Sequence, residues 1–481
     1  MGDSVDVFNV GRFSLSEESR SKEKVTPVAT EDKNAVKVGQ VVEKYGYQYL
    51  WTTMHISVSE LETWRTLGDD VADSAVQSDL ETRHKSTSEQ SQKCRRAEDL
   101  LTRLKGKCQR REGNKPDDGY DEAKQFMESL ALPDWVDWER VRRGQLFFLK
   151  HLVGASTCLL HISLIGGFGA PKINKVLNST GYLASAPEST FKRLVETIQM
   201  ISDCMGDGAL QKGGVGWNSV ARVRLLHAAV RVRLKSQPKW DMHTWGLPIN
   251  QEDLFVTTLA FSQVVLNGLE RIGSTLTTSH EDMEDYLHLW RVIGHLMGVQ
   301  PALLQRMESL WGAQAALESV VLHLVEPDAS TRRLANHLIA SMVGRLPTGR
   351  SEMEMAGLTR RLMGNHYADA MGIPVVNDPV LLSTIDKRLA GMRAIPQMMT
   401  IPFIGNALTI FTKWGLDKWI ILNLGGRRSS FGLSYPPSDL QRARSEAESN
   451  PPSCIFASVG FSGWKEVVEQ ERWIGGFPFL E

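Results

Sequence analysis

The sequence predicts an all-α protein, on three observations. The alternation of apolar and polar residues that is typical of strands is scarce along the 481 residues, whereas apolar side chains recur at three- and four-residue spacing. Capping residues and Gly/Pro clusters separate successive apolar segments. With 42% hydrophobic residues, the chain can bury a substantial core. We therefore expect one large helical bundle with a polar N-terminal region and a C-terminal tail.

Charge and cysteine content limit the classes of function. The 55 Lys and Arg residues balance 56 Asp and Glu residues, so net charge gives no reason to expect a nucleic-acid partner, and no DNA- or RNA-binding motif is visible. The five cysteines are scattered and never in CxxC spacing, which is typical of a reduced, intracellular protein. We expect a cytoplasmic or a peripherally membrane-associated location.

The N-terminal third divides into two parts. Residues 1–44 are rich in Ser, Glu, Lys and Asp with few aromatic residues, which predicts a flexible leader. Residues 45–130 begin with the aromatic run YGYQYLW and continue in a polar helical pattern. We expect this second part to be a helical N-terminal extension that packs against the rest of the chain.

Two strongly apolar tracts follow. The run Leu146–Ile165 predicts one buried core helix, because Lys150, His151 and His161 interrupt it and a membrane span needs about 20 clean apolar residues. The second tract, residues 401–426, contains charged side chains, so a packed helix or a hairpin at a membrane interface is favoured over a span.

The tail differs in composition from these tracts. Residues 429–481 start as a polar linker with two Pro-Pro pairs and end in an aromatic segment. We expect the aromatic segment to fold back over the core.

A helix is predicted over residues 185–204. Arg193 and Thr197 are spaced i, i+4 within it, so their side chains leave the same face. A glycine-rich connector, residues 206–216, leads to the next helix. Its glycines lack the spacing of a phosphate-binding loop, which argues against a nucleotide cradle.

The helix predicted over Trp217–Leu234 is apolar on most of its circumference, which is typical of a central, buried helix. His227 lies in its middle, with Arg224 and Arg231 within about one turn. Two interpretations remain open on these residues alone. His227 is a core histidine whose ring is hydrogen-bonded, or it presents its imidazole to a metal while the arginines neutralise the anionic groups of a cofactor.

Other histidines offer weaker candidates. His151 and His161 are ten residues apart, so they do not share a helix face, and a core or pocket-lining role is favoured. His288 and His295 do share one side, but a metal site would need carboxylates at matched positions. The acidic residues near them are better explained as a solvated helix start.

Six segments in one order resemble a known family. The resemblance is to the catalytic domain shared by the rubber oxygenases (latex-clearing proteins) and the ER-bound oxygenase MpaB. It covers residues 132–345, and more weakly extends to residue 424. The segments are LPDWVDWERVRRGQLFFLKHLVGA, FGAPKINKVLNSTGYL, FKRLVET, VARVRLLHAAVR, LPINQEDLFVTTLAFS and EDYLHLWRVIGHLMGV.

This resemblance implies a haem b-dependent oxygenase on a globin-like helical core around a haem pocket. The implied reaction uses dioxygen to cleave a carbon–carbon double bond in an isoprenoid or other apolar substrate. By resemblance, His227 is the proximal ligand of the haem iron, with Arg224 and Arg231 as partners of the propionates and an acceptor on the second imidazole nitrogen. Arg193 and Thr197 match the distal Arg-x-x-x-Thr pair and are the expected catalytic residues.

The sequence also departs from the family. Glu196 stands where the rubber oxygenase has a lysine that can cap the iron, and no N-terminal membrane anchor is visible. We expect a haem-binding oxygenase domain over residues 131–428. A haem protein of another kind, such as a peroxidase-like enzyme or sensor, and a non-catalytic helical scaffold are the alternatives. The oligomeric state stays open.

The resemblance makes one spatial prediction. The helix that carries Arg193 and Thr197 should face His227 across the same cavity.

Overall fold

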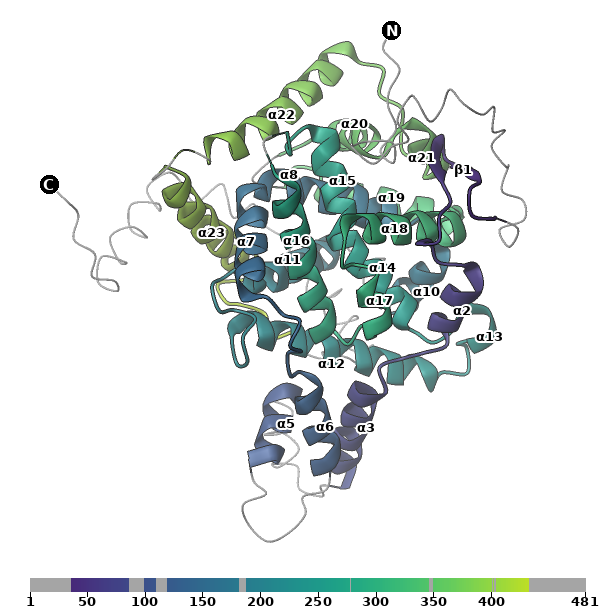
Figure 1. The fold of residues 1–481 in the computed structure, drawn as a ribbon, viewed down its shortest axis with the longest axis vertical. Helices are drawn as coiled ribbons and strands as arrows, with labels where there is room; N and C mark the ends of the chain where they lie inside the picture. The colour runs from purple at the N-terminus through teal and green to yellow at the C-terminus, as the bar shows by residue number, and fades with distance from the viewer. Residues whose placement is uncertain are drawn as a thin grey trace, which may run out of the picture. The chain divides into compact units, whose positions relative to one another are not determined.

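The structure is a computed structural model, and it describes residues 36–85, 99–109, 119–180, 187–276, 278–345, 349–399, 401 and 404–431. These residues form a helical bundle (Figure 1), which confirms the predicted all-α class. The helices are α2 (Val58–Arg65), α3 (Asp70–Lys85), α5 (Leu100–Gln109), α6 (Tyr120–Ser129), α7 (Trp138–Lys150), α8 (Leu152–Cys158), η3 (Leu159–Leu164), α9 (Ile165–Gly167), α10 (Pro171–Thr180), α11 (Pro187–Cys204), α12 (Val215–Lys235), α13 (Met242–Trp245), α14 (Gln251–Phe261), α15 (Gln263–Ile272), α16 (His280–Leu296), α17 (Pro301–Gln305), α18 (Leu310–Leu324), α19 (Ala329–Met342), α20 (Glu352–Met363), α21 (Asn365–Ala370), α22 (Pro379–Met398) and α23 (Ile404–Asn423).

One small sheet accompanies the helices. Strands β1 (Val41–Lys44) and β2 (Tyr47–Leu50) pair antiparallel, and both turn residues between them have positive φ, as a two-residue hairpin turn requires. The hairpin is fixed to α18, where the Tyr47 hydroxyl donates to Glu318 Oε1 at 3.1 Å. The last residues of the predicted leader thus form a strand, while residues 1–35 lie outside the described residues.

The apolar run Leu146–Ile165 is not the single helix that the sequence predicts. It breaks at His151 between α7 and α8, and the two parts are bent by 83°. His151 is buried at the bend, and its Nδ1 lies 3.0 Å from Ser274 Oγ, so a tertiary hydrogen bond occupies the ring at the break. The run continues as the π-helix η3. The prediction was wrong about continuity because local apolar content does not report where a tertiary contact turns the chain.

The length and hydropathy of the helices bear on whether one of them could cross a membrane. Among the described residues, no single helix is long and apolar enough to cross a bilayer. Helix α7 and the segment Leu152–Gly167 pass by length and composition only when taken together, despite the 83° bend.

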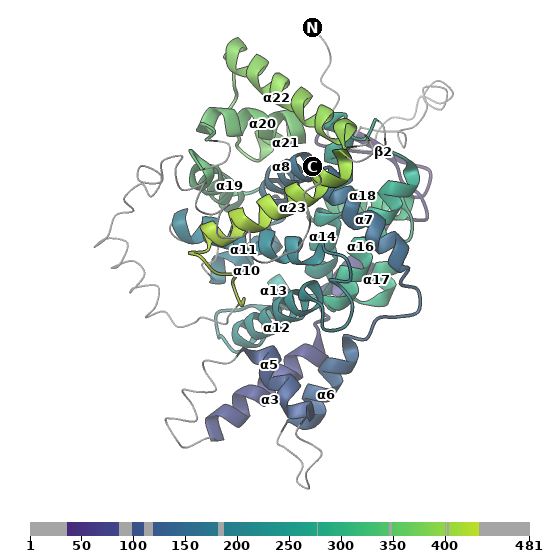
Figure 2. The same ribbon diagram turned by 90° about the vertical axis from the view of Figure 1, so that its left-hand side faces the viewer.

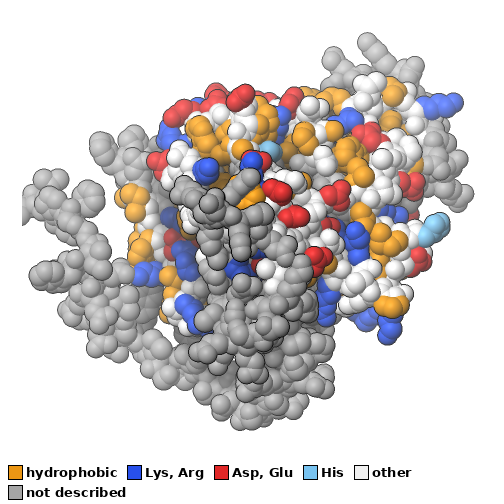
Figure 3. Space-filling view, turned by 90° about the horizontal axis from the view of Figure 1, so that it is seen from below, with side chains coloured by type: hydrophobic (Ala, Val, Ile, Leu, Met, Phe, Trp, Pro, Cys, Tyr) orange, Lys and Arg blue, Asp and Glu red, His pale blue; other side chains and the backbone are white. Residues whose placement is uncertain are grey.

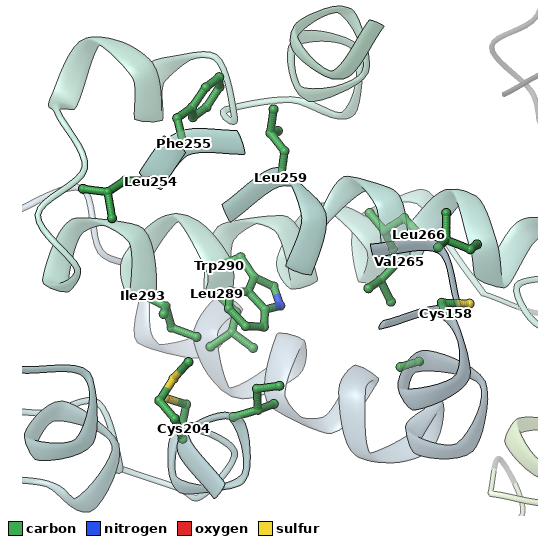
Figure 4. Packing of buried hydrophobic residues seen from close by; sticks show 14 of the residues in the cluster. Cys158, Cys204, Leu254, Phe255, Leu259, Val265, Leu266, Leu289, Trp290 and Ile293 are labelled. Carbon is green, nitrogen blue, oxygen red and sulfur yellow. The ribbon is translucent and has the colours of Figure 1, made fainter. Parts of the chain in front are cut away.

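The core lies where α14, α15 and α16 meet α7, α8 and α11. Figure 4 shows Leu289, Trp290 and Ile293 of α16 between Cys204 of α11 and apolar side chains of α14 and α15. Capping boxes start two of these helices: Asn250 with Asp253 on α14, and Ser279 with Asp282 on α16.

Helix α12 is central, as predicted for an apolar circumference. It packs against α3, α5, α11 and α16. Both of its ends are buried, Trp217 in the main hydrophobic cluster and Leu234 outside it.

The N-terminal helices belong to the same core. Helices α3, α5 and α6 pack on one another and group at one end of the bundle in both ribbon views (Figures 1 and 2). Leu61, Leu101, Leu104 and Phe126 join the main hydrophobic cluster. The predicted boundary at residue 130 therefore does not correspond to a break in the packing.

The surface seen from below mixes charges of both signs. In Figure 3, Lys and Arg side chains alternate with Asp and Glu, and apolar side chains lie between them. This agrees with the nearly equal numbers of basic and acidic residues. The predicted linker and tail, apart from residues 429–431, lie outside the described residues.

Candidate functional site

His227 lies at the middle of α12, in the interior of the bundle. Burial is the largest cause that lowers the pKa of its imidazole to about 4, and the nearby Arg231 guanidinium adds to this. The ring is therefore neutral at physiological pH, with a lone pair on one nitrogen. Its Nδ1 is buried and has no hydrogen-bond partner among the described residues.

The side chain of His227 is half-buried, and burial is the largest cause of its lowered pKa. An axial haem ligand needs such a neutral imidazole.

Arg224 lies one turn before His227 and is already paired. Its Nε and Nη2 donate to the two carboxylate oxygens of Asp69 at 2.7 and 2.9 Å, and both side chains are buried. Gly298 lies against this pair at φ +86°. A Cβ there would stand 2.5 Å from Asp69 Oδ2 and 2.7 Å from Arg224 Nε, so only glycine fits.

Arg231 lies one turn after His227 and is paired in the same way. Its Nε donates to both oxygens of Asp73 at 2.8 and 2.9 Å, and its Nη1 donates to the Ile249 carbonyl at 2.6 Å. Burial raises the pKa of Asp73, and the hydrogen bond from Arg231 opposes that rise. The predicted propionate role of Arg224 and Arg231 therefore competes with two ion pairs to the start of α3.

The start of α14 adds further buried charge to this junction. Glu252 forms an ion pair with Arg65, and both side chains are almost inaccessible. Burial raises the pKa of the neighbouring Asp253 to about 6, against the attraction of Arg65 and other cations. We call this cluster of Arg65, Asp69, Asp73, Arg224, Arg231, Glu252 and Asp253 the buried charge junction.

Arg193 and Thr197 lie on α11, in a more open setting. Arg193 is half-buried and donates from Nη1 to Glu196 Oε2 at 2.6 Å. Thr197 is exposed, and its hydroxyl donates to the Arg193 carbonyl one turn back at 3.0 Å. Its oxygen keeps lone pairs for another donor.

Glu196 links this pair to the residues that follow α23. Its Oε1 accepts from the Ser429 hydroxyl at 3.0 Å, and Gln199 binds the backbone of Ser429 through both its amide nitrogen and its oxygen. Arg428 forms an ion pair with Asp203. The segment 428–431 therefore lies along the polar side of α11.

The two predicted halves of the site lie on helices that pack together. Helix α11 contacts α12, and the Ser219 hydroxyl of α12 donates to Asp203 Oδ2 of α11 at 2.5 Å. This contact lies at the C-terminal end of α11, about two turns from Arg193 and Thr197. That these two side chains face His227 across one cavity stays a prediction.

The other histidines have partners that explain their burial. His161 Nδ1 lies 2.8 Å from the Thr359 hydroxyl, and burial lowers its pKa to about 3. His288 Nε2 accepts from the Asp137 backbone at 3.1 Å, and His295 Nε2 lies 2.8 Å from the Ala131 carbonyl. The contact of His161 agrees with the core role expected for that residue.

In the part of the chain that the structure describes, no three His, Cys, Asp or Glu residues are grouped so that they could hold a metal ion. This finding does not bear on the haem prediction for His227, because a haem iron takes only one or two protein ligands.

Sequence reasoning missed the acidic partners of α12. Asp69 and Asp73 are four residues apart and share a face of α3, while Arg224 and Arg231 are two turns apart on α12. That spacing was a usable signal. Matching the two aspartates with the two arginines, however, required knowing that α3 and α12 lie side by side. The link from Glu196 to Ser429 spans 233 residues and left no local signal.

Comparison with known proteins agrees with this fold. Residues 148–393 match the family model described as ER-bound oxygenase mpaB/B'/Rubber oxygenase, catalytic domain. The rubber oxygenase of Streptomyces sp. (strain K30) is 24% identical over 320 residues, which are 64% of this chain and 74% of that protein. The structure of latex clearing protein LCP in the closed state superimposes with a TM-score of 0.53 at 20% identity, covering 76% of this chain and 93% of that one. The chain belongs to the family of the ER-bound oxygenase mpaB/B' and rubber oxygenase catalytic domain.

Proposed function

We propose that this protein is a haem b-dependent oxygenase that uses dioxygen to cleave a carbon–carbon double bond in an isoprenoid or other apolar substrate. The family and the similarity to a rubber oxygenase support the reaction class and a polyisoprene-like substrate. The single observation that carries the haem assignment is the neutral imidazole of His227 in the middle of the central helix α12.

The residues around His227 fit a haem ligand in one respect and need rearrangement in another. The low pKa keeps one ring nitrogen unprotonated, so its lone pair is available to a metal, and Nδ1 makes no hydrogen bond that would compete for it. The acceptor expected on the other ring nitrogen is not among the described residues. No hydrogen bond to such an acceptor therefore raises the basicity of the imidazole. Arg224 and Arg231 would bind haem propionates only if their ion pairs with Asp69 and Asp73 opened, or if each arginine bound its aspartate and a propionate together.

Haem, when bound, would supply the iron chemistry that activates dioxygen. The chain supplies the surroundings. Apolar side chains of α12 next to His227, such as Val223 and Ala228, pack into or against the main core and exclude water. An apolar wall suits a hydrocarbon substrate, since binding it removes apolar surface from water.

Arg193 and Thr197 are proposed to act on oxygen-bearing groups. The Arg193 guanidinium stays positively charged and stabilises negative charge that develops on oxygen. The Thr197 hydroxyl is turned back to the Arg193 carbonyl, so its oxygen accepts a proton donor unless the hydroxyl rotates. Glu196 neutralises part of the Arg193 charge and fixes its orientation.

A spectroscopic experiment tests the haem assignment. Purified protein, reconstituted with haem, is expected to show a Soret band that is lost in His227→Ala and kept in His161→Ala. The second variant is a matched control, because His161 is a buried histidine whose pKa is also lowered by burial and whose Nδ1 is hydrogen-bonded. If no Soret band forms after reconstitution, the haem proposal is wrong and the non-catalytic scaffold is favoured.

A second experiment tests the reaction. We expect oxygen uptake with an isoprenoid substrate and the appearance of aldehyde or ketone products. A haem-loaded protein without oxygen uptake would instead be a haem protein of another kind.

A further inference from the structure

Helix α23 is apolar on two opposite sides. The inner side packs on α11, where Leu416, Trp419 and Ile420 contact Phe191 and Val195. This contact accounts for one half of the helix circumference. It does not account for the apolar residues on the other half.

The outer side of α23 presents large apolar side chains to solvent. Ile410, Phe411 and Leu422 are 71%, 64% and 72% exposed. Phe411 and Leu422 are eleven residues apart, which is close to three full turns, so they share one side of the helix. Phe411 and Ile420 are nine residues apart and point in opposite directions. The exposed residues therefore form a ridge along the helix.

The ridge continues into the end of α22. Ile395, Met398 and Ile401 are exposed, and Ile401 precedes α23 by three residues. In Figure 2 helix α23 runs across the face turned toward the viewer, with α22 above it. We call the exposed apolar residues of α22, α23 and Ile401 the α22–α23 face.

This face lies in a strongly basic part of the chain. Residues 379–428 contain seven Lys and Arg residues against two acidic residues, whereas the whole chain has a net charge of -1. Both acidic residues are in ion pairs, Asp386 with Arg361 and Asp417 with Lys413. Two of the basic residues also pair with carboxylates outside this range, Arg388 with Glu354 and Arg428 with Asp203. These pairs leave out Lys387, Arg393 and Arg427. Trp414 of α23 lies beside one of the basic side chains, because Lys418 Nζ is 5.9 Å from the centroid of the Trp414 ring.

We propose that the α22–α23 face docks onto the surface of an anionic lipid bilayer, with α23 lying in the plane of the interface. An apolar ridge beside basic side chains is the pattern of interfacial helices, in which the ridge enters the acyl boundary while the cations meet anionic headgroups. Tryptophan favours the same boundary because its ring has an apolar body and a polar edge. The inner side of α23 stays on α11, so the helix lies on the membrane and does not cross it. This proposal does not depend on the proposed function.

The test uses the full-length protein and sedimentation with lipid vesicles. We expect binding to vesicles of phosphatidylcholine with phosphatidylserine, and at least tenfold weaker binding to phosphatidylcholine alone. Raising the salt concentration should weaken binding to the anionic vesicles, because screening shortens the reach of the basic residues. Absence of binding to anionic vesicles would overturn the proposal, as would equal binding to both kinds.

Two variants separate the apolar and the charged contributions. Phe411→Asp with Leu422→Asp should reduce binding at least tenfold, and Arg393→Glu with Arg427→Glu should remove the preference for anionic lipid. Val38→Asp is the matched control, since Val38 is 62% exposed and lies just before β1, on the opposite side of Figure 1 from α23. All these positions are exposed, so thermal unfolding should show that the fold is kept.

Size-exclusion chromatography of the same variants tests whether a second copy of the chain, instead of a bilayer, covers the α22–α23 face. If the wild-type protein forms a dimer that Phe411→Asp with Leu422→Asp converts to a monomer, and vesicle binding does not change, the face is an interface between two copies and the bilayer proposal is wrong.

Discussion

Two groups of arginine–carboxylate pairs flank the candidate site, and they differ in burial. In the buried charge junction, Arg224 and Arg231 are paired with Asp69 and Asp73 and nearly inaccessible to solvent. On α11, Arg193 is paired with Glu196 but is only half-buried, and the neighbouring Thr197 is exposed. The same chemistry therefore has two different physical settings within one bundle.

Burial decides what each group can do. Breaking a buried pair leaves an uncompensated charge in the interior, which is strongly destabilising, so the junction holds α3 on α12. A half-buried pair exchanges partners at small cost because water solvates the released charge. Arg193 can thus exchange its partner for a ligand, whereas Arg224 and Arg231 mainly position the helix that carries His227.

The largest expected effect is at the junction. Asp73→Asn should lower the free energy of unfolding by about 3–5 kcal/mol, because Arg231 stays charged and loses its partner in the interior. Urea unfolding measures this. Glu139→Gln is the control, since Glu139 pairs with Arg142 on the surface and its loss should cost below about 1 kcal/mol. Equal effects of the two substitutions would remove the distinction between buried and open pairs.

The next effect concerns pH. Burial raises the pKa of Asp253 from its ordinary 3.8 to about 6, so the folded state holds this proton more tightly than the unfolded chain. Its contribution to stability is therefore fully present below pH 4 and is lost as the pH rises through 6. Asp253→Asn cannot ionise and should gain up to about 3 kcal/mol relative to wild type between pH 4 and 7.

Unfolding of both proteins across that pH range checks this prediction. Taking the difference cancels the buried histidines, such as His227, whose lowered pKa values act in the opposite direction. A difference that does not change with pH would mean that Asp253 is ionised throughout.

A catalytic effect is expected on α11. If the proposed function is right, Arg193→Ala should lower turnover roughly ten- to a hundred-fold through loss of charge stabilisation, while haem stays bound. The Soret band and oxygen uptake measure the two properties separately. Lys192→Ala is the control on an exposed neighbouring position. Loss of haem from Arg193→Ala would mean that this residue belongs to the cofactor-holding group.

The smallest expected effect is at Glu196. Glu196→Gln and Ser429→Ala should each change the free energy of unfolding by less than about 1 kcal/mol, because the contacts are half-open to water. A double-mutant cycle with urea unfolding measures their coupling. If either substitution lowered the free energy of unfolding about as much as Asp73→Asn, the contact between Glu196 and Ser429 would be as important for stability as the buried charge junction. The two groups of pairs would then not differ.

Much of the fold could be predicted from local pattern. The apolar circumference of α12 gave its central position in the bundle. The break at His151 could not be predicted in this way, because a hydrogen bond to Ser274, 123 residues away, occupies the ring at the bend. Local sequence reports propensity and periodicity, whereas a bend of this kind is set by what packs against it.

The candidate site divides along the same line. The sequence by itself determined that His227 is interior, that two arginines flank it and that Arg193 and Thr197 share a helix face, since these follow from helical periodicity alone. Only the tertiary structure decided that Asp69 and Asp73 occupy those arginines and that Glu196 is tied to Ser429. The physical reason is that charge pairing depends on distances between helices, and a residue's own neighbours in sequence do not encode those distances.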